Sequence, residues 1–279
     1  MCLGRIVDQG CSSSTSASEP DQQTKNKERR APRIWSDSGA RADGRASGNP
    51  EFRISNFEFC AVPSYHWRVA LIDDDALVLD SLPYRDRDLI LSLVTPSAGM
   101  VRGVLRGARG GKSPTAGSTQ ILSLVHMIAY HARHAEMATI RQVDLKTSSY
   151  PVSSSLEGSA AAAVVSELLT TFCPLSEPAP RRFRLGVAAL DALLADVPPS
   201  IVVAYVQFWS LALGGVLPPI RESGLDEEDV EFLLACRTRP LAEISETPPQ
   251  STVQWFDRNV RSAAERPLRA LDFLRANLP

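Results

Sequence analysis

The chain has few cysteines, and their spacing excludes two common uses of this residue. Five cysteines are scattered over 279 residues, and no two form a Cys-x-x-Cys pair. Structural zinc sites need closely spaced cysteine or histidine pairs, and disulfide-rich secreted domains need a dense, even set. We therefore expect a protein of a reducing compartment, the cytoplasm, that holds no metal and no other cofactor.

Apolar runs long enough to cross a membrane are also missing. Residues 197–220 carry no charge, but proline pairs bound them and Gly214 and Gly215 interrupt them. The helix that fits between, residues 200–213, would be about 21 Å long, too short for a hydrocarbon core of about 30 Å. We predict a buried helix at the centre of a bundle and no membrane partner. The first residues contain no apolar stretch of signal-peptide length.

Asp and Glu are absent from residues 89–135, although the formal net charge of the whole chain is only −2. That stretch contains the glycine-rich segment VRGVLRGARGGKS, in which four basic residues follow one another: Arg102, Arg106, Arg109 and Lys112. Uncompensated positive charge of this kind is typical of a surface that binds a polyanion such as nucleic acid. A solvated strand without a ligand is the alternative interpretation. A phosphate-binding loop is disfavoured, because Arg106 stands where that motif needs its first glycine.

Periodicity divides the chain into three parts. Residues 1–67 lack the apolar residues that a core needs, and we interpret them as a disordered or mis-started extension. Residues 68–147 show alternating polarity in five short segments, which we predict to be strands: residues 75–82, 89–95, 100–108, 120–130 and 137–143. In residues 148–279 the apolar spacing predicts helices: residues 155–172, 182–194, 200–213, 226–235 and 253–278.

Five short strands, of which the central one is rich in glycine and basic residues, indicate a small barrel. Gly103 and Gly107 would allow the third strand to curve strongly, and Arg102, Val104 and Arg106 would share its outer face. The predicted fold class is therefore α+β, with an N-terminal five-stranded oligonucleotide-binding (OB) barrel followed by an all-α domain.

No residues are arranged for catalysis or for metal binding. Successive side chains of Asp73–Asp75 would point to opposite faces of a strand, so we expect a solvated lead-in to a strand. His126, His131 and His134 have no cysteine nearby, and we expect them to be loop or DNA-facing residues. His131 and His134 would lie in a loop beside Arg133, which we expect to contact DNA. The nucleophile elbow Gly-x-Ser-x-Gly is absent, so an enzyme is not expected. Three tyrosines lie near the barrel, and we expect packing for each, with base stacking as the alternative: Tyr84, Tyr130 and Tyr150.

The order and spacing of several segments resemble the bacterial DNA repair protein RecO family. The resemblance begins near Leu71, ends near Leu278, and rests on these segments: residues 76–88, 104–109, 120–124, 204–218 and 266–274. Arg85 and Asp86 replace the Gly-Glu that usually follows the tyrosine of the first segment. Some members carry a four-cysteine zinc module in the helical half, whereas Cys236 stands alone here, so the chain resembles a zinc-free member.

The resemblance implies a non-catalytic recombination mediator, associated with the nucleoid. Such proteins bind single- and double-stranded DNA, anneal complementary strands and, with RecR, help to load RecA onto DNA coated by single-stranded-DNA-binding protein. The acidic tail of that coating protein would dock on the helical half, and we consider Arg181, Arg182 and Arg184 as its site, with a solvated helix start as the alternative. A protein-binding adaptor, whose basic OB face engages an acidic tail, is the competing hypothesis.

Overall fold

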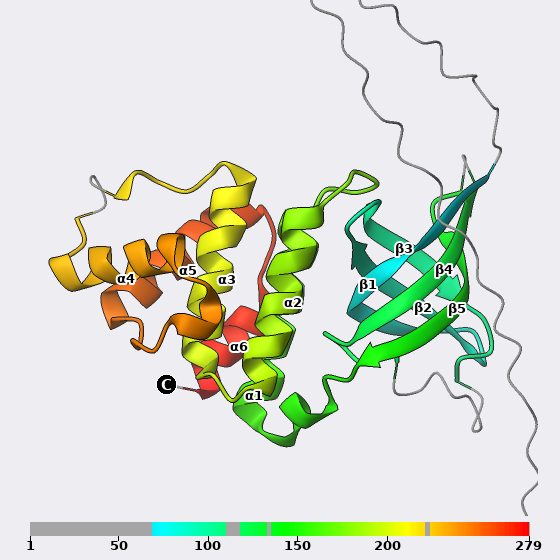
Figure 1. Ribbon diagram of the computed structural model, residues 1–279, viewed down its shortest axis with the longest axis horizontal. Coiled ribbons are helices and arrows are strands. Elements are labelled where there is room, and N and C mark those ends of the chain that lie inside the picture. Colours follow the sequence, from blue (N-terminus) through cyan, green and yellow to red (C-terminus); the bar gives the residue numbers. More distant parts are fainter. Residues whose placement is uncertain (1–68, 110–117, 133–134, 221–223, 279) are drawn as a thin grey trace, which may run out of the picture. The chain divides into compact units, whose positions relative to one another are not determined.

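The computed structural model describes residues 69–109, 118–132, 135–220 and 224–278 (Figure 1). The expected extension, residues 1–67, lies outside these residues, as do the predicted DNA contacts Lys112 and Arg133 and the histidine His134.

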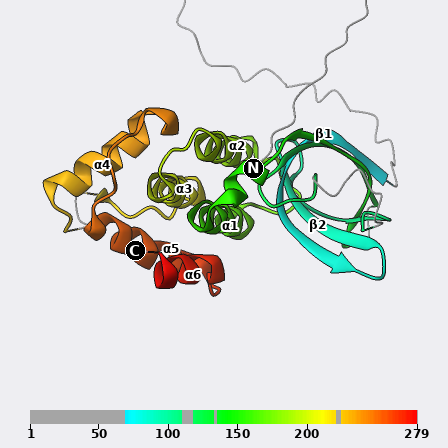
Figure 2. The same cartoon turned by 90° about the horizontal axis from the view of Figure 1, so that it is seen from below.

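Five strands in the described residues form a closed barrel in the order β1-β2-β3-β5-β4. They are β1 (Val69–Tyr84), β2 (Asp88–Thr95), β3 (Gly99–Leu105), β4 (Leu124–Ala132) and β5 (Ala138–Thr147). All neighbours are antiparallel except β3 and β5, which run parallel. Figure 2 shows the strands curving round into a ring. All five predicted strands are present, but β1 starts six residues before the predicted strand. The prediction missed these residues because the polar stretch Asp73–Asp75 interrupts the apolar pattern.

The barrel interior follows from alternation along each strand. On β3, Val101 and Leu105 face inward and are buried, whereas Arg102 between them is exposed. Gly103 also faces inward, where an added Cβ would lie 2.7 Å from the Ile140 side chain on β5. A larger residue at position 103 would therefore push β3 away from β5, and glycine permits their close approach.

Six α-helices follow within the described residues, so the α+β class is confirmed. They are α1 (Leu156–Phe172), α2 (Pro180–Leu194), α3 (Pro199–Gly214), α4 (Glu227–Thr238), α5 (Gln250–Ala264) and α6 (Arg269–Asn277), with short 3₁₀ helices η1 (Tyr150–Ser154) and η3 (Leu241–Glu243). The single helix predicted over residues 253–278 is wrong. Pro267 disfavours helical backbone at the residue before it, and Glu265 takes a left-handed conformation (φ 52°), so α5 ends there.

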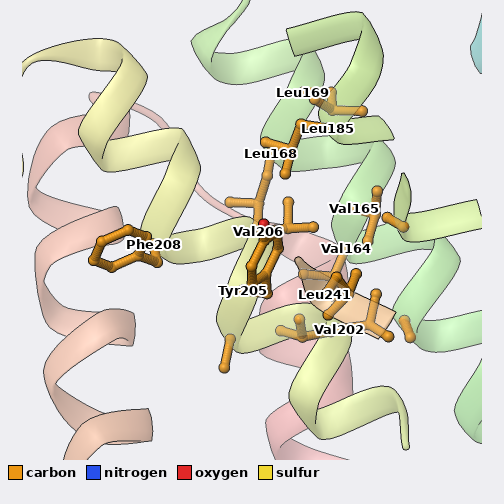
Figure 3. Close-up of a cluster of buried hydrophobic side chains, with 14 of the residues drawn as sticks. Val164, Val165, Leu168, Leu169, Leu185, Val202, Tyr205, Val206, Phe208 and Leu241 are labelled. Carbon is orange, nitrogen blue, oxygen red and sulfur yellow. The ribbon is translucent and has the colours of Figure 1, made fainter. Parts of the chain in front are cut away.

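Helix α3 lies at the centre of the helical part, as predicted from its all-round apolar sequence. Its residues Ile201–Leu211 are buried almost without exception, and α1, α2 and α5 pack against it. Figure 3 shows Val202, Tyr205 and Val206 of α3 among side chains of α1 and α2. None of the helices in the described part of the chain combines the length and apolar character needed to cross a membrane.

The barrel and the helices share part of one core. Leu77 and Leu79 of β1 and Val94 of β2 are buried in the same cluster as the helix side chains. The Ser166 hydroxyl on α1 donates a hydrogen bond to the Leu79 carbonyl, and Gly186 of α2 approaches Leu77 so closely that a Cβ would lie 2.6 Å from it. The division of the chain into a barrel domain, residues 68–147, and a helical domain, residues 148–279, remains a prediction.

Candidate nucleic-acid interface

The basic segment begins on the outer face of β3 and continues into the turn that follows. Arg102 is exposed on the strand, and Arg106 and Arg109 are exposed beyond its end at Leu105. Gly107 takes a left-handed conformation (φ 70°), which turns the chain after Arg106. The predicted outward direction of Arg102 is therefore confirmed, while Arg106 belongs to a turn instead of the predicted strand.

This turn is held against the start of β2, and the contact adds a residue that sequence reasoning missed. The Gly107 amide donates to Asp88 Oδ1 at 2.9 Å, and the Arg109 amide donates to the Arg87 carbonyl at 3.0 Å. The exposed side chain of Arg87 is thus brought beside the basic segment. Only backbone pairing brings residues 87 and 109 together, so no local sequence pattern could have revealed it.

The guanidinium groups of this surface have no protein partners among the described residues. No ion pair or side-chain hydrogen bond is formed there by the guanidinium groups of Arg87, Arg102, Arg106 and Arg109. Three arginines of the helical part behave differently: Arg239, Arg261 and Arg275 each contact a carboxylate. Exposed, unpaired guanidinium groups keep all their donors for an external anion, and phosphate matches their planar geometry.

Two carboxylates on β1 are paired away from the basic surface. Asp73 and Asp75 lie inside β1, not in a lead-in to it, and both carboxylates contact the His126 ring at 3.1 and 3.3 Å. Lys146 Nζ lies 2.5 Å from Asp75 and, through that hydrogen bond, holds the pKa of Asp75 below its usual range. In the barrel order β1 and β3 are not neighbours, so these acids do not sit on the strands that carry the basic surface.

Two further expectations for this region are corrected. His131 lies within β4 instead of a loop, and its Nε2 is 2.9 Å from the Ala135 carbonyl. Packing was expected for the tyrosines, yet Tyr130 is 42% exposed and Tyr150 is 74% exposed. Tyr84 is half-buried with the Arg85 guanidinium 5.1 Å from its ring centroid. Successive side chains of β4 alternate between the inside and the outside of the barrel, and Tyr130 points to the outside, where the helices do not cover it.

A second basic feature is a groove of about 420 Å³ between α2 and α3. Its walls combine two arginines with apolar and aromatic side chains: Arg181, Arg184, Leu185, Ala188, Tyr205, Trp209 and Leu213. The third candidate of this site, Arg182, does not line the groove, and its Nη2 donates to the Leu213 carbonyl at 2.9 Å. Arg181 and Arg182 project in different directions from α2, because successive residues of an α-helix are about 100° apart around its axis.

Metal ligands were not expected in this chain. Across the described residues, no three His, Cys, Asp or Glu side chains are grouped so that they could hold one metal ion. Cys173 and Cys236 are both buried free thiols, and burial raises the pKa of Cys236 to about 12.

Comparison with known sequences points to one family. A family profile described as "Recombination protein O N terminal" matches residues 69–149. Proteins named "DNA repair protein RecO" are similar to the chain: one from Koribacter versatilis is 27% identical over 165 residues, and one from Dehalococcoides mccartyi (strain CBDB1) is 29% identical over 147 residues. Over its barrel residues the chain is therefore similar to the RecO family. The resemblance predicted from its segments is therefore confirmed.

The matched region of the RecO profile coincides with the barrel. It begins at the first residue of β1 and ends one residue before η1. The alignments cover 58% and 53% of this chain, and 66% and 57% of these two RecO proteins, so less than two thirds of either relative is matched.

Proposed function

We propose that this chain is a RecO-type, DNA-binding recombination mediator of DNA repair, and that its barrel is an OB fold. The observation that carries the proposal is the set of unpaired, exposed arginines on β3 and the adjoining turns: Arg87, Arg102, Arg106 and Arg109. Binding through them would involve phosphate oxygens, so single- and double-stranded DNA would both bind without regard to sequence. A closed five-stranded barrel with basic residues on its outer face is typical of OB folds that bind oligonucleotides.

We propose further that the chain anneals complementary strands and, with RecR, helps RecA to load onto DNA coated by single-stranded-DNA-binding protein. These steps need binding and alignment but no bond chemistry, so we propose a non-catalytic role. The support is the similarity to proteins named RecO, together with the basic surface.

The first experiment is a titration of a labelled single-stranded oligonucleotide with the full chain at several salt concentrations. Binding that weakens steeply as salt rises supports a phosphate-binding surface. The competing adaptor hypothesis, in which the basic face engages an acidic protein tail, predicts no measurable DNA binding. A second assay measures annealing of complementary strands already coated by single-stranded-DNA-binding protein, and absence of acceleration would refute the mediator role.

We propose that the groove between α2 and α3 receives the acidic C-terminal tail of single-stranded-DNA-binding protein. An acidic tail ending in an apolar residue needs a cation beside an apolar pocket, and Arg181 and Arg184 flank Leu185 and Trp209 in this groove. Arg184→Ala should weaken binding of a tail peptide about tenfold, as expected for loss of one charge-assisted contact. Arg258→Ala, which removes an exposed arginine of α5, is the matched control. Equal binding by both variants would place the tail elsewhere.

A further inference from the structure

Tyr130 belongs to a row of side chains that crosses four strands on the outer face of the barrel. Its cross-strand neighbours are Leu71 on β1 and Thr139 on β5, and Thr139 is paired in turn with Val104 on β3. Leu71 is 58% exposed and Tyr130 is 42% exposed. The neighbouring residue Ala129 is fully buried, so alternation directs the Tyr130 ring outward. An exposed aromatic ring beside an exposed leucine is apolar surface that the described part of the protein leaves uncovered.

Arginines flank this ring. The Arg141 guanidinium carbon lies 6.0 Å from the centroid of the Tyr130 ring, within the range of cation–π attraction. Arg106, from the basic surface, lines the same hollow, which has a volume of about 570 Å³ and includes Met137 and Thr139 in its walls. Among the described residues, neither guanidinium contacts a carboxylate. The hollow therefore combines a π-face, apolar walls and two cations that have no anionic partner there.

Aromatic faces between unpaired cations match the chemistry of one nucleotide of a single strand. A base that is not paired can stack on an aromatic ring, while its flanking phosphates meet the guanidinium groups. A base inside a duplex is already stacked on both sides, so a duplex cannot use the ring. The backbone would approach from Arg102 and Arg106 on the β3 side, because Val104 and Thr139 connect β3 to Tyr130.

We propose that Tyr130, with Arg141 and Arg106, forms a binding site for one unstacked nucleobase of single-stranded DNA. The site rests on the proposed DNA-binding function and adds to it a preference for single strands over duplex. Because every base has a π-face, the site accepts any of the four bases.

The test compares two single-stranded probes with equal numbers of phosphates, one an oligothymidine and the other fully abasic. Full-length wild-type chain should bind oligothymidine about tenfold more tightly than the abasic strand, which is the lower part of the range for stacking of one base (about 1.4 kcal/mol). Tyr130→Ala should lower oligothymidine affinity to that of the abasic strand and leave abasic binding unchanged. Tyr130→Phe keeps the ring and should retain the wild-type difference.

Arg102→Ala provides the matched contrast, because it removes a proposed phosphate contact and no base contact. Arg102→Ala should lower the affinity for both probes equally and reduce the magnitude of the log affinity–log salt slope by about 0.7. Tyr130→Ala should leave that slope unchanged. Equal binding of the two probes by wild-type chain, or equal losses on both probes for Tyr130→Ala with an unchanged melting temperature, would overturn the base site and leave the proposed DNA-binding function standing. If wild-type chain bound neither probe, both proposals would fall together.

Discussion

Replacing Arg102 and Arg106 together by alanine is the sharpest test of the basic surface. Both side chains are exposed and neither has a partner among the described residues, so each can contribute one phosphate contact. For single-stranded DNA each neutralised phosphate adds about 0.7 to the magnitude of the log–log salt slope, and the double variant should lose about 1.4. Between 50 and 200 mM salt this lost slope corresponds to a factor of about seven in affinity, which fluorescence anisotropy measures readily.

The change should be independent of base sequence, because phosphate contacts position a protein on DNA without reading bases. Stability should change by less than about 0.5 kcal/mol, since exposed residues without partners contribute little to folding. A charge-matched control, Arg258→Ala with Arg269→Ala, removes two exposed arginines from α5 and α6. It should leave the slope unchanged. If the test variant keeps wild-type affinity and slope while folded, or if the control flattens the slope equally, the surface on β3 is not the DNA contact.

Three further outcomes follow from local geometry and composition. Arg85 takes a left-handed conformation (φ 52°) at the turn between β1 and β2, where RecO relatives are expected to have glycine, so Arg85→Gly should raise the free energy of unfolding by about 0.5–1 kcal/mol in a urea titration. A decrease would show that the contact of Arg85 with Tyr84 outweighs the backbone strain. Asp229 at the start of α4 accepts hydrogen bonds from the Ser251 and Thr252 hydroxyls; burial raises its pKa, but these bonds, together with the backbone amides of Asp226 and Thr252, leave the pKa below its usual range. Asp229→Ala should therefore cost about 2 kcal/mol at pH 7, and the difference should shrink as the pH falls below about 4, because the lowered pKa stabilises the fold only while the carboxyl is ionised. A cost that stayed constant down to pH 2 would assign the effect to packing alone. Treatment with a chelator should leave the melting temperature unchanged, since no zinc is expected, and stoichiometric zinc in an elemental analysis would contradict this.

Local sequence patterns were sufficient for most of the secondary structure. Alternation over residues 100–105 predicted both a strand and the outward direction of Arg102, because a strand repeats every two residues whatever it packs against. The all-round apolar character of residues 200–213 predicted a central helix for the same kind of reason. The sequence was a poorer guide where polar residues occupy a strand, as at Asp73–Asp75, or where a proline ends a helix that apolar spacing would continue, as at Pro267.

Absence of acidic residues from residues 89–135 was enough to locate the basic surface, because charge is a property of composition and needs no coordinates. Other residues of this surface and of the hollow beside it come from other segments, and only the tertiary structure brings them there. Arg87 reaches the basic segment through a backbone contact with Arg109, and Arg141 and Tyr130 meet Arg106 because β3 pairs with β5 when the barrel closes. The same is true of Arg182, which donates to the Leu213 carbonyl and does not line the groove. Contacts of this kind join residues far apart in the chain, and no local period records them.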